Sequence, residues 1–182
     1  MKSGTTFCPN IYRMTDPDKI PNRSAFDKVQ KWRRNKQRKG LLLVGPTRTG
    51  KTRAMWNMLE ARRNDPECKL NTLYFDAMAW PLAVSSIMAQ PEETEEWARE
   101  LCNYDLCPSI FWDDLFKFPQ TEARMSMLFG VIERRMAHMC YNFCTLNGTP
   151  DEIRARMPEK AASDMVLPLI ERLKECCEVI EF

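Results

Sequence analysis

The sequence has few of the features from which metal sites and membrane spans are built. It has a single histidine, and none of its eight cysteines forms a C-x-x-C pair. A zinc site is therefore disfavoured, and the cysteines are expected to be reduced, mostly apolar core residues. No apolar run reaches the roughly 18 residues of a membrane span, and residues 1–10 lack the apolar centre of a signal peptide. We therefore expect a cytoplasmic protein that does not enter a membrane.

Net charge is also small. The formal charge of +2 over 182 residues gives no overall attraction to nucleic acid, and the length fits about one domain. Seven cations nevertheless fall within residues 28–39: Lys28, Lys31, Arg33, Arg34, Lys36, Arg38 and Lys39. A helix is expected to begin at Ser24, capped with the help of Asp27, and to carry Trp32 near its apolar face. This basic helix either touches DNA phosphates or is a solvated surface, and the sequence leaves both open.

What the sequence does contain is a phosphate-binding motif. Residues 45–52, GPTRTGKT, match G-x-x-x-x-G-K-[ST], with an apolar strand at 41–44 before them and an amphipathic helix after them. In such a loop the backbone N–H groups surround a β-phosphate, Lys51 reaches the β and γ oxygens, and the Thr52 hydroxyl binds Mg²⁺. The predicted nucleotide-binding residues are Gly45, Pro46, Thr47, Arg48, Thr49, Gly50, Lys51, Thr52 and Arg53.

A second motif lies at residues 108–114, PSIFWDD, where a short apolar run ends in two carboxylates. Ligands of parallel α/β sheets lie outside the carboxyl ends of the strands, so these acids are expected beside the phosphate loop. Asp113 is predicted to bind Mg²⁺ and Asp114 to polarise the attacking water. After the next apolar run comes Asn147, whose amide either senses the γ-phosphate and the attacking water or simply favours a turn.

The remaining elements complete an alternation of strands and helices. Further strands are expected at 72–75, 141–145 and 178–182, and helices at 51–63, 82–89, 92–102, 121–139, 151–156 and 163–177. The Met-rich stripe of 121–139 is expected to face the core, and one of Arg134 and Arg135 beside it is a candidate for contact with a neighbouring subunit. Residues 1–23 are expected to form an arm that docks a partner or packs on the core, and residues 24–182 the core itself.

Taken together, GPTRTGKT, IFWDD, FCTLN and LIERL followed by EVIEF resemble the AAA+ ATPases of the DnaC and IstB type, which are replicative helicase loaders and transposition helper ATPases. The resemblance implies an α/β P-loop NTPase core with a five-stranded parallel sheet flanked by helices, and ATP hydrolysis at subunit interfaces. It implies that Asn147 is the sensor 1 residue and that Arg172 is an arginine finger that completes a neighbour's site. Arg48 replaces the glycine usual in relatives, and no C-terminal lid domain with a sensor 2 arginine is expected.

The resulting hypothesis is a Mg²⁺-dependent ATPase that assembles head to tail as a homo-oligomer on DNA, as a helicase loader or replication accessory protein. Its expected ligands are ATP and Mg²⁺, and its expected partners are single- or double-stranded DNA and a replicative helicase or transposase. Thr52 and Asp113 would bind the metal, and Asp114, Asn147 and Arg172 would be catalytic. The alternatives are the motor of a superfamily 3 viral replication helicase, a small-molecule kinase and a non-hydrolysing adaptor.

Overall fold

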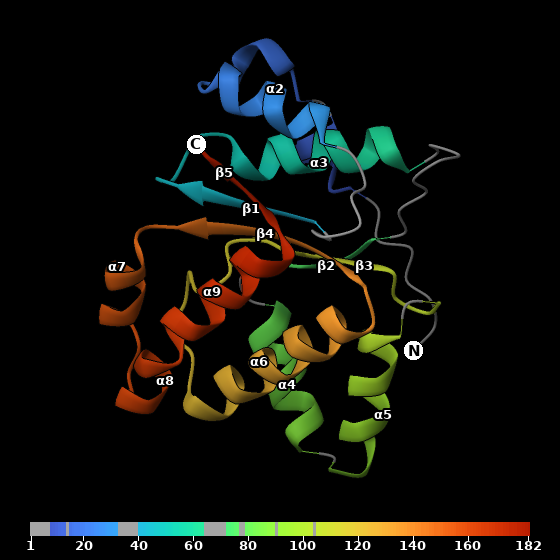
Figure 1. Ribbon diagram of the computed structural model, residues 1–182, viewed down its shortest axis with the longest axis vertical. Helices are drawn as coiled ribbons and strands as arrows, with labels where there is room; N and C mark the ends of the chain where they lie inside the picture. Colours follow the sequence, from blue (N-terminus) through green and yellow to red (C-terminus); the bar gives the residue numbers. More distant parts are fainter. Residues whose placement is uncertain are drawn as a thin grey trace.

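A five-stranded parallel sheet lies at the centre of the molecule (Figure 1). The computed structural model describes residues 8–13, 15–32, 40–63, 72–76, 79–89, 91–103 and 105–182. The strands are β1 (Gly40–Gly45), β2 (Thr72–Phe75), β3 (Ser109–Trp112), β4 (Tyr141–Asn147) and β5 (Glu178–Glu181), in the order β2-β3-β4-β1-β5. Every neighbouring pair runs parallel, which confirms the predicted fold class.

Alternation along the strands divides the core into two layers. In β1, Leu41 and Leu43 point to one face of the sheet and Leu42 to the other, and all three are fully buried. The first face is covered by α2 (Arg23–Lys31) and α3 (Lys51–Arg62). The second is covered by α4 (Ala79–Met88), α5 (Pro91–Cys102), α6 (Glu122–Ala137) and α9 (Val166–Cys176) (Figure 1). No helix in the described part of the chain is long and apolar enough to cross a membrane.

The described part of the N-terminal arm packs on the first layer. It contains α1 (Asn10–Arg13) and the short 3₁₀ helix η1 (Pro17–Lys19). Cys8 and Ile20 are buried in one cluster with side chains of α2 and α3. The expected cap of α2 was wrong, because Asn22 rather than Ser24 caps the helix and accepts the Ala25 N–H at 3.0 Å. Ser24 lies inside the first turn.

The helix α2 is shorter than the basic run that begins within it. It ends at Lys31, and the next residue, Trp32, is 3% exposed. The indole of Trp32 makes T-shaped contacts with Tyr141 and Phe143, at ring-centroid distances of 6.1 and 5.4 Å. Trp32 is therefore a core residue that a nucleic acid does not reach. Lys28 and Lys31 are exposed, whereas the remaining cations lie outside the described residues: Arg33, Arg34, Lys36, Arg38 and Lys39.

Two proline residues decide where helices of the second layer begin. The expected helix at 163–177 is instead two helices, α8 (Lys160–Asp164) and α9. Pro168 has no N–H to donate and its ring crowds the carbonyl four residues earlier, so it is accommodated in the first turn of a new helix. Pro81 similarly occupies the first turn of α4, which begins at Ala79 rather than at residue 82.

Arg135 is buried at the edge of the sheet where β3 and β4 begin. It is 0% exposed, so only Arg134 of this pair can face a neighbouring subunit. Its Nε donates to Asn142 Oδ1 at 3.0 Å, and its two terminal nitrogens donate to the backbone oxygens of Leu101, Cys107 and Tyr141. One side chain thus fastens the end of α5 and the starts of β3 and β4 to α6.

Candidate functional site

The candidate site lies at the opposite edge of the sheet, where three neighbouring strands end. The loop 45–50 follows β1, Asp113 and Asp114 follow β3, and Asn147 closes β4, which lies between the other two. Parallel strands present their carboxyl ends at one edge, so these segments meet although they are far apart in the sequence. The structure therefore brings the loop, both acids and Asn147 together, as expected. Their chemical roles remain predictions.

The loop 45–50 curls tightly in front of α3. Gly50 precedes the helix with φ 97°, and a Cβ there would lie 2.9 Å from Ile20 Cγ2 of the arm. Arg48 also has a left-handed φ of 63°, a conformation that favours glycine. The arginine therefore occupies a backbone conformation in which a glycine would be less strained.

Lys51 is folded back over its own loop. Its Nζ donates to the carbonyl oxygens of Gly45 and Pro46, at 2.9 and 2.5 Å, and the residue is 4% exposed. Burial lowers the pKa of Lys51, and the nearby charges of Asp114 and Asp113 oppose this change. The Lys51 ammonium group is therefore hydrogen-bonded to the carbonyl oxygens of its own loop and lies near the charges of Asp114 and Asp113.

Asp113 is held by three hydroxyl groups. Its Oδ1 accepts hydrogen bonds from Thr52 at 2.8 Å and Thr145 at 2.7 Å, and its Oδ2 accepts one from Tyr74 at 3.1 Å. Burial raises the pKa of Asp113, and the hydrogen bonds from Thr145, Thr52 and Tyr74 oppose this change. Burial and the Asp113 charge also raise the pKa of Tyr74. The tyrosine hydroxyl is therefore a donor to Asp113.

The donor set around Asp113 fits magnesium. Thr52 and Asp113 offer a hydroxyl and a carboxylate within 2.8 Å of each other, and Mg²⁺ prefers oxygen ligands, often one or two from protein and the rest from phosphates and water. Among the described residues no cluster of three or more His, Cys, Asp and Glu side chains could hold a metal by itself. A metal here would accordingly depend on phosphate oxygens.

Asp114 points toward Asn147 and Lys117. It accepts a hydrogen bond from Asn147 Nδ2, and its Oδ2 lies 3.3 Å from Lys117 Nζ. Its own N–H donates to Thr145 Oγ1 at 2.7 Å, and its φ is 51°. The hydroxyl of Thr145 therefore links the two acids, because it also donates to Asp113.

Two cavities adjoin the loop. The first, here the loop cavity, measures about 710 Å³ and lies between residues 47–53, the arm and Asp114. Its lining carries six cations, Lys19, Arg48, Lys51, Arg53, Lys117 and Arg156, and one acid, Asp114. The second, here the strand cavity, measures about 900 Å³ and is lined by β1, β5, α7 (Pro150–Ala155) and α9. Thr47, Asn147 and Arg156 line both cavities.

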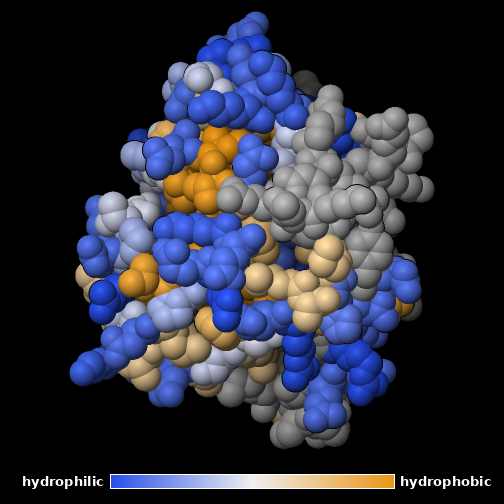
Figure 2. All heavy atoms as spheres, viewed as in Figure 1, coloured by the Kyte–Doolittle hydropathy of each residue, from blue (hydrophilic) through white to orange (hydrophobic). Residues whose placement is uncertain are grey.

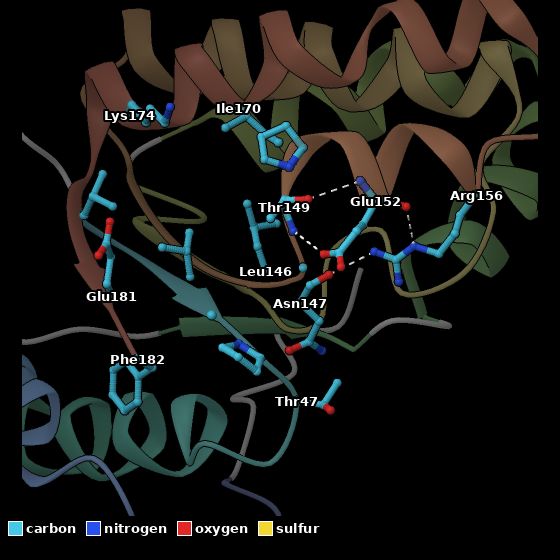
Figure 3. Close-up of a pocket in the computed structure, with 16 residues that line it drawn as sticks. Thr47, Leu146, Asn147, Thr149, Glu152, Arg156, Ile170, Lys174, Glu181 and Phe182 are labelled. Carbon is cyan, nitrogen blue, oxygen red and sulfur yellow. Dashed lines mark hydrogen bonds between the residues drawn. The ribbon is translucent and has the colours of Figure 1, made fainter.

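The strand cavity is the more apolar of the two. Leu146 and Ile170 lie on one side of it, and Phe182 lies on the other (Figure 3). Figure 2 shows hydrophobic side chains at the surface in the region of β1 and β5, between hydrophilic helices. A polyanion fits the first cavity by charge, and an apolar ring fits the second.

Two of the predicted residues make their contacts elsewhere than with the acids. Arg53 lines the loop cavity, but its Nη1 donates to Ile11 O at 3.2 Å and Thr15 Oγ1 at 3.1 Å in the arm. Arg172 is exposed on α9 and forms ion pairs with Glu133 at 2.6 Å and Glu175 at 2.7 Å.

Arg172 also lies on the far side of its helix from the strand cavity. Ile170 and Lys174, each two residues from it, line that cavity, and residues two apart on a helix do not share a face. Arg172 therefore points away from its own chain's loop.

Sequence reasoning missed four side chains at the site: Tyr74, Thr145, Lys117 and Arg156. Thr145 had a signal, because a polar residue within a buried strand, two positions before Asn147, faces the same side of the sheet as Asn147. Tyr74, Lys117 and Arg156 had none, since their positions depend on tertiary packing.

Comparison with solved structures identifies the fold. A crystal structure of DnaI matches with a TM-score of 0.60 and 18% identity, covering 97% of this chain and 95% of that one. The DnaC helicase loader matches with a TM-score of 0.63 and 17% identity, covering 98% and 94%. The fold is that of the AAA+ P-loop core.

The same fold is also found in a replication initiator. The DnaA protein bound to AMPPCP and single-stranded DNA matches with a TM-score of 0.63 and 11% identity, covering 88% of this chain and 44% of that one. No protein-family model and no curated protein matches the sequence. The resemblance to DnaC-type AAA+ proteins is therefore confirmed in the fold.

Proposed function

We propose that the protein binds ATP with Mg²⁺ and hydrolyses it to ADP and phosphate. The observation that carries this proposal is that Lys51, Thr52 and Asp114 line the loop cavity, with Asp113 hydrogen-bonded to Thr52 beside them. A P-loop-like turn without acids would serve only to bind phosphate, and acids without the turn would have nothing to act on. Their juxtaposition provides both requirements.

Each group has a distinct task in this reaction. The backbone N–H groups of the loop and the start of α3 bind the β-phosphate, and Lys51 leaves its carbonyl partners for the β and γ oxygens. Thr52 and Asp113 would hold Mg²⁺, which would supply neutralisation of charge on the phosphates. Asp114 polarises the attacking water, and Asn147 orients Asp114 through its amide. The adjoining strand cavity offers the nearest apolar space for the base.

Arg172 is proposed to act on a neighbouring subunit. It is exposed and faces away from its own loop, so it can complete the site of another copy only in a head-to-tail homo-oligomer. Its present ion pairs with Glu133 and Glu175 are on the surface, where water and salt screen them strongly. Exchanging them for a phosphate therefore costs little, whereas arginine fingers accelerate hydrolysis by about 10³ to 10⁵.

Replication is the proposed setting. One structural neighbour is a helicase loader and another is a DNA replication initiator bound to single-stranded DNA, so we propose a cytoplasmic loader or accessory ATPase that assembles on DNA. A replicative helicase or a transposase is the corresponding protein partner. Lys28 and Lys31 on the exposed face of α2 supply two of the phosphate contacts.

The test is phosphate release measured over a range of protein concentrations, with and without single-stranded DNA. We expect Mg²⁺-dependent release that rises more steeply than protein concentration and is stimulated by DNA. Asp114→Asn should abolish release while retaining ATP binding. Transfer of phosphate to a nucleoside, with none released as free phosphate, would instead establish a kinase. Binding that persists without any release in the wild type would establish an adaptor.

A further inference from the structure

Arg156 lies where the loop cavity and the strand cavity meet, and it belongs to none of the nucleotide-binding motifs. It is the C-cap residue that follows α7, and it lines both the loop cavity and the strand cavity. Figure 3 shows its guanidinium group pointing back from the helix toward Asn147. The side chain therefore brings a positive charge from a separate helix to the place where the acids and the loop meet.

The hydrogen bonds of Arg156 leave most of its donors available. Its Nε donates to Glu152 O at 3.1 Å, and its Nη2 donates to Asn147 O at 2.9 Å. A guanidinium group has five N–H donors, and no carboxylate forms an ion pair with Arg156 within the described part of the chain. The charge is thus held in place by two backbone oxygens and is not neutralised by them.

Its neighbour on the same helix is held quite differently. Arg154 is half-buried, lies within 3.8 Å of both Asp151 and Asp164, and lines neither cavity. The two arginines thus lie two residues apart at the end of α7 and carry the same charge, but only Arg156 is directed at the site. This contrast provides a matched control.

We propose that Arg156 binds the terminal phosphate of a nucleoside triphosphate held by the same chain. The inference rests on the proposed function and adds a second arginine to it. Arg156 would bind the γ-phosphate in its own chain, whereas Arg172 is proposed to act on the site of a neighbouring subunit. A guanidinium group suits this task because its donors can meet two phosphate oxygens at once.

The position of Arg156 favours the γ-phosphate over the β-phosphate. The loop amides and the start of α3 already surround the β-phosphate, whereas Arg156 is hydrogen-bonded to Asn147, whose side chain donates to Asp114. Asp114 is the group proposed to face the attacking water, and that water must approach the terminal phosphorus. Arg156 therefore favours the binding of a triphosphate over a diphosphate. Its hydrogen bond to Asn147 O connects the phosphate contact to β4.

The experiment compares the affinities of the full chain for AMPPCP and for ADP, each with Mg²⁺. Arg156→Gln keeps a donor for Asn147 O but removes the charge. We expect it to weaken AMPPCP binding about tenfold or more while changing ADP binding less than about twofold. Arg156→Lys should recover part of the AMPPCP affinity, and Arg154→Gln should change neither affinity. Thermal unfolding of each variant shows whether it is folded.

Three outcomes would overturn the inference. Equal losses of ADP and AMPPCP affinity would show that Arg156 only caps the end of β4. Unchanged AMPPCP affinity in a folded Arg156→Gln variant would show that it contacts no phosphate, while leaving the proposed function intact. A wild-type protein that binds neither nucleotide would overturn the proposed function and this inference with it.

Discussion

Within the described residues, two cations are buried at opposite edges of the sheet, and they are held in different ways. Arg135 lies where β3 and β4 begin, is 0% exposed, and donates to three backbone oxygens and one amide oxygen. Lys51 lies where β1 ends, is 4% exposed, borders a cavity and faces two acids. Both charges are shielded from water, but only the lysine can change partners.

This difference separates a structural charge from a functional one. Arg135 joins fixed elements from several directions, so its removal takes a donor from four oxygens at once. Of these, Asn142 Oδ1 would still accept a hydrogen bond from Trp112 Nε1, at 3.4 Å. The partners of Lys51 belong to a single loop, and a phosphate group would replace them. The first charge should therefore matter mainly for stability, and the second mainly for binding.

Arg135→Met should have the largest effect on stability. It leaves the oxygens of Leu101, Cys107, Tyr141 and Asn142 without this donor, and we expect the free energy of unfolding to fall by about 3 to 5 kcal/mol. Urea denaturation measures it. The adjacent exposed Arg134→Met is the control and should stay within about 0.5 kcal/mol of the wild type. Equal midpoints for the two variants would contradict the structural role of Arg135.

Lys51→Ala should show the converse pattern. ATP affinity, measured by calorimetry with Mg²⁺, should fall about tenfold to a hundredfold, because one charge-assisted contact to the phosphates is lost. The free energy of unfolding without nucleotide should change by only about 1 kcal/mol, since the lost hydrogen bonds are offset by the relief of a buried charge. A large loss of stability would show that Lys51, like Arg135, matters mainly for stability, and would contradict the distinction between the two residues.

Asp113→Asn tests the contribution of a buried acid near Lys51 to stability. Burial raises the pKa of Asp113 in the folded protein, so its ionised form opposes folding at neutral pH, and the amide variant should be more stable by about 1 kcal/mol at pH 7. As the pH falls and the wild-type carboxylate takes up a proton, this advantage should shrink. Denaturation at several pH values measures it. Asp114→Asn, which loses the ion pair with Lys117, should show no such gain.

Arg48→Asn tests the smallest effect. Asparagine tolerates a left-handed backbone better than arginine does, so this substitution should raise the free energy of unfolding by about 0.5 to 1 kcal/mol. Thermal denaturation without nucleotide measures it. A drop in stability would show that the φ of 63° at Arg48 is not a strained position.

Much of the fold and the centre of the site could be predicted from the sequence. The loop 45–52 and the acids at 113 and 114 carry recognisable spacing, and the apolar runs beside them fix the order of strands and helices. Asn147 could be placed because it directly follows an apolar strand. Each of these signals is local, and a parallel sheet then brings the strand ends together.

What the sequence could not give depends on contacts between distant segments. Arg135 looks like a surface residue of a helix until the ends of α5, β3 and β4 surround it. The directions of Tyr74 and Arg156 are equally set by their tertiary partners. The division of 163–177 into two helices was missed because Pro168 is compatible both with a kink and with a new first turn.

The central claim is that the terminal phosphates of a nucleotide are held between the loop 45–52 and the acids at 113 and 114. Calorimetric titration of the wild-type protein with ATP, in the presence and absence of Mg²⁺, tests it most directly. The account predicts saturable binding of one nucleotide per chain that weakens without Mg²⁺ and in Lys51→Ala. A folded protein that shows neither heat of binding nor a shift of its thermal midpoint with ATP and Mg²⁺ would contradict it.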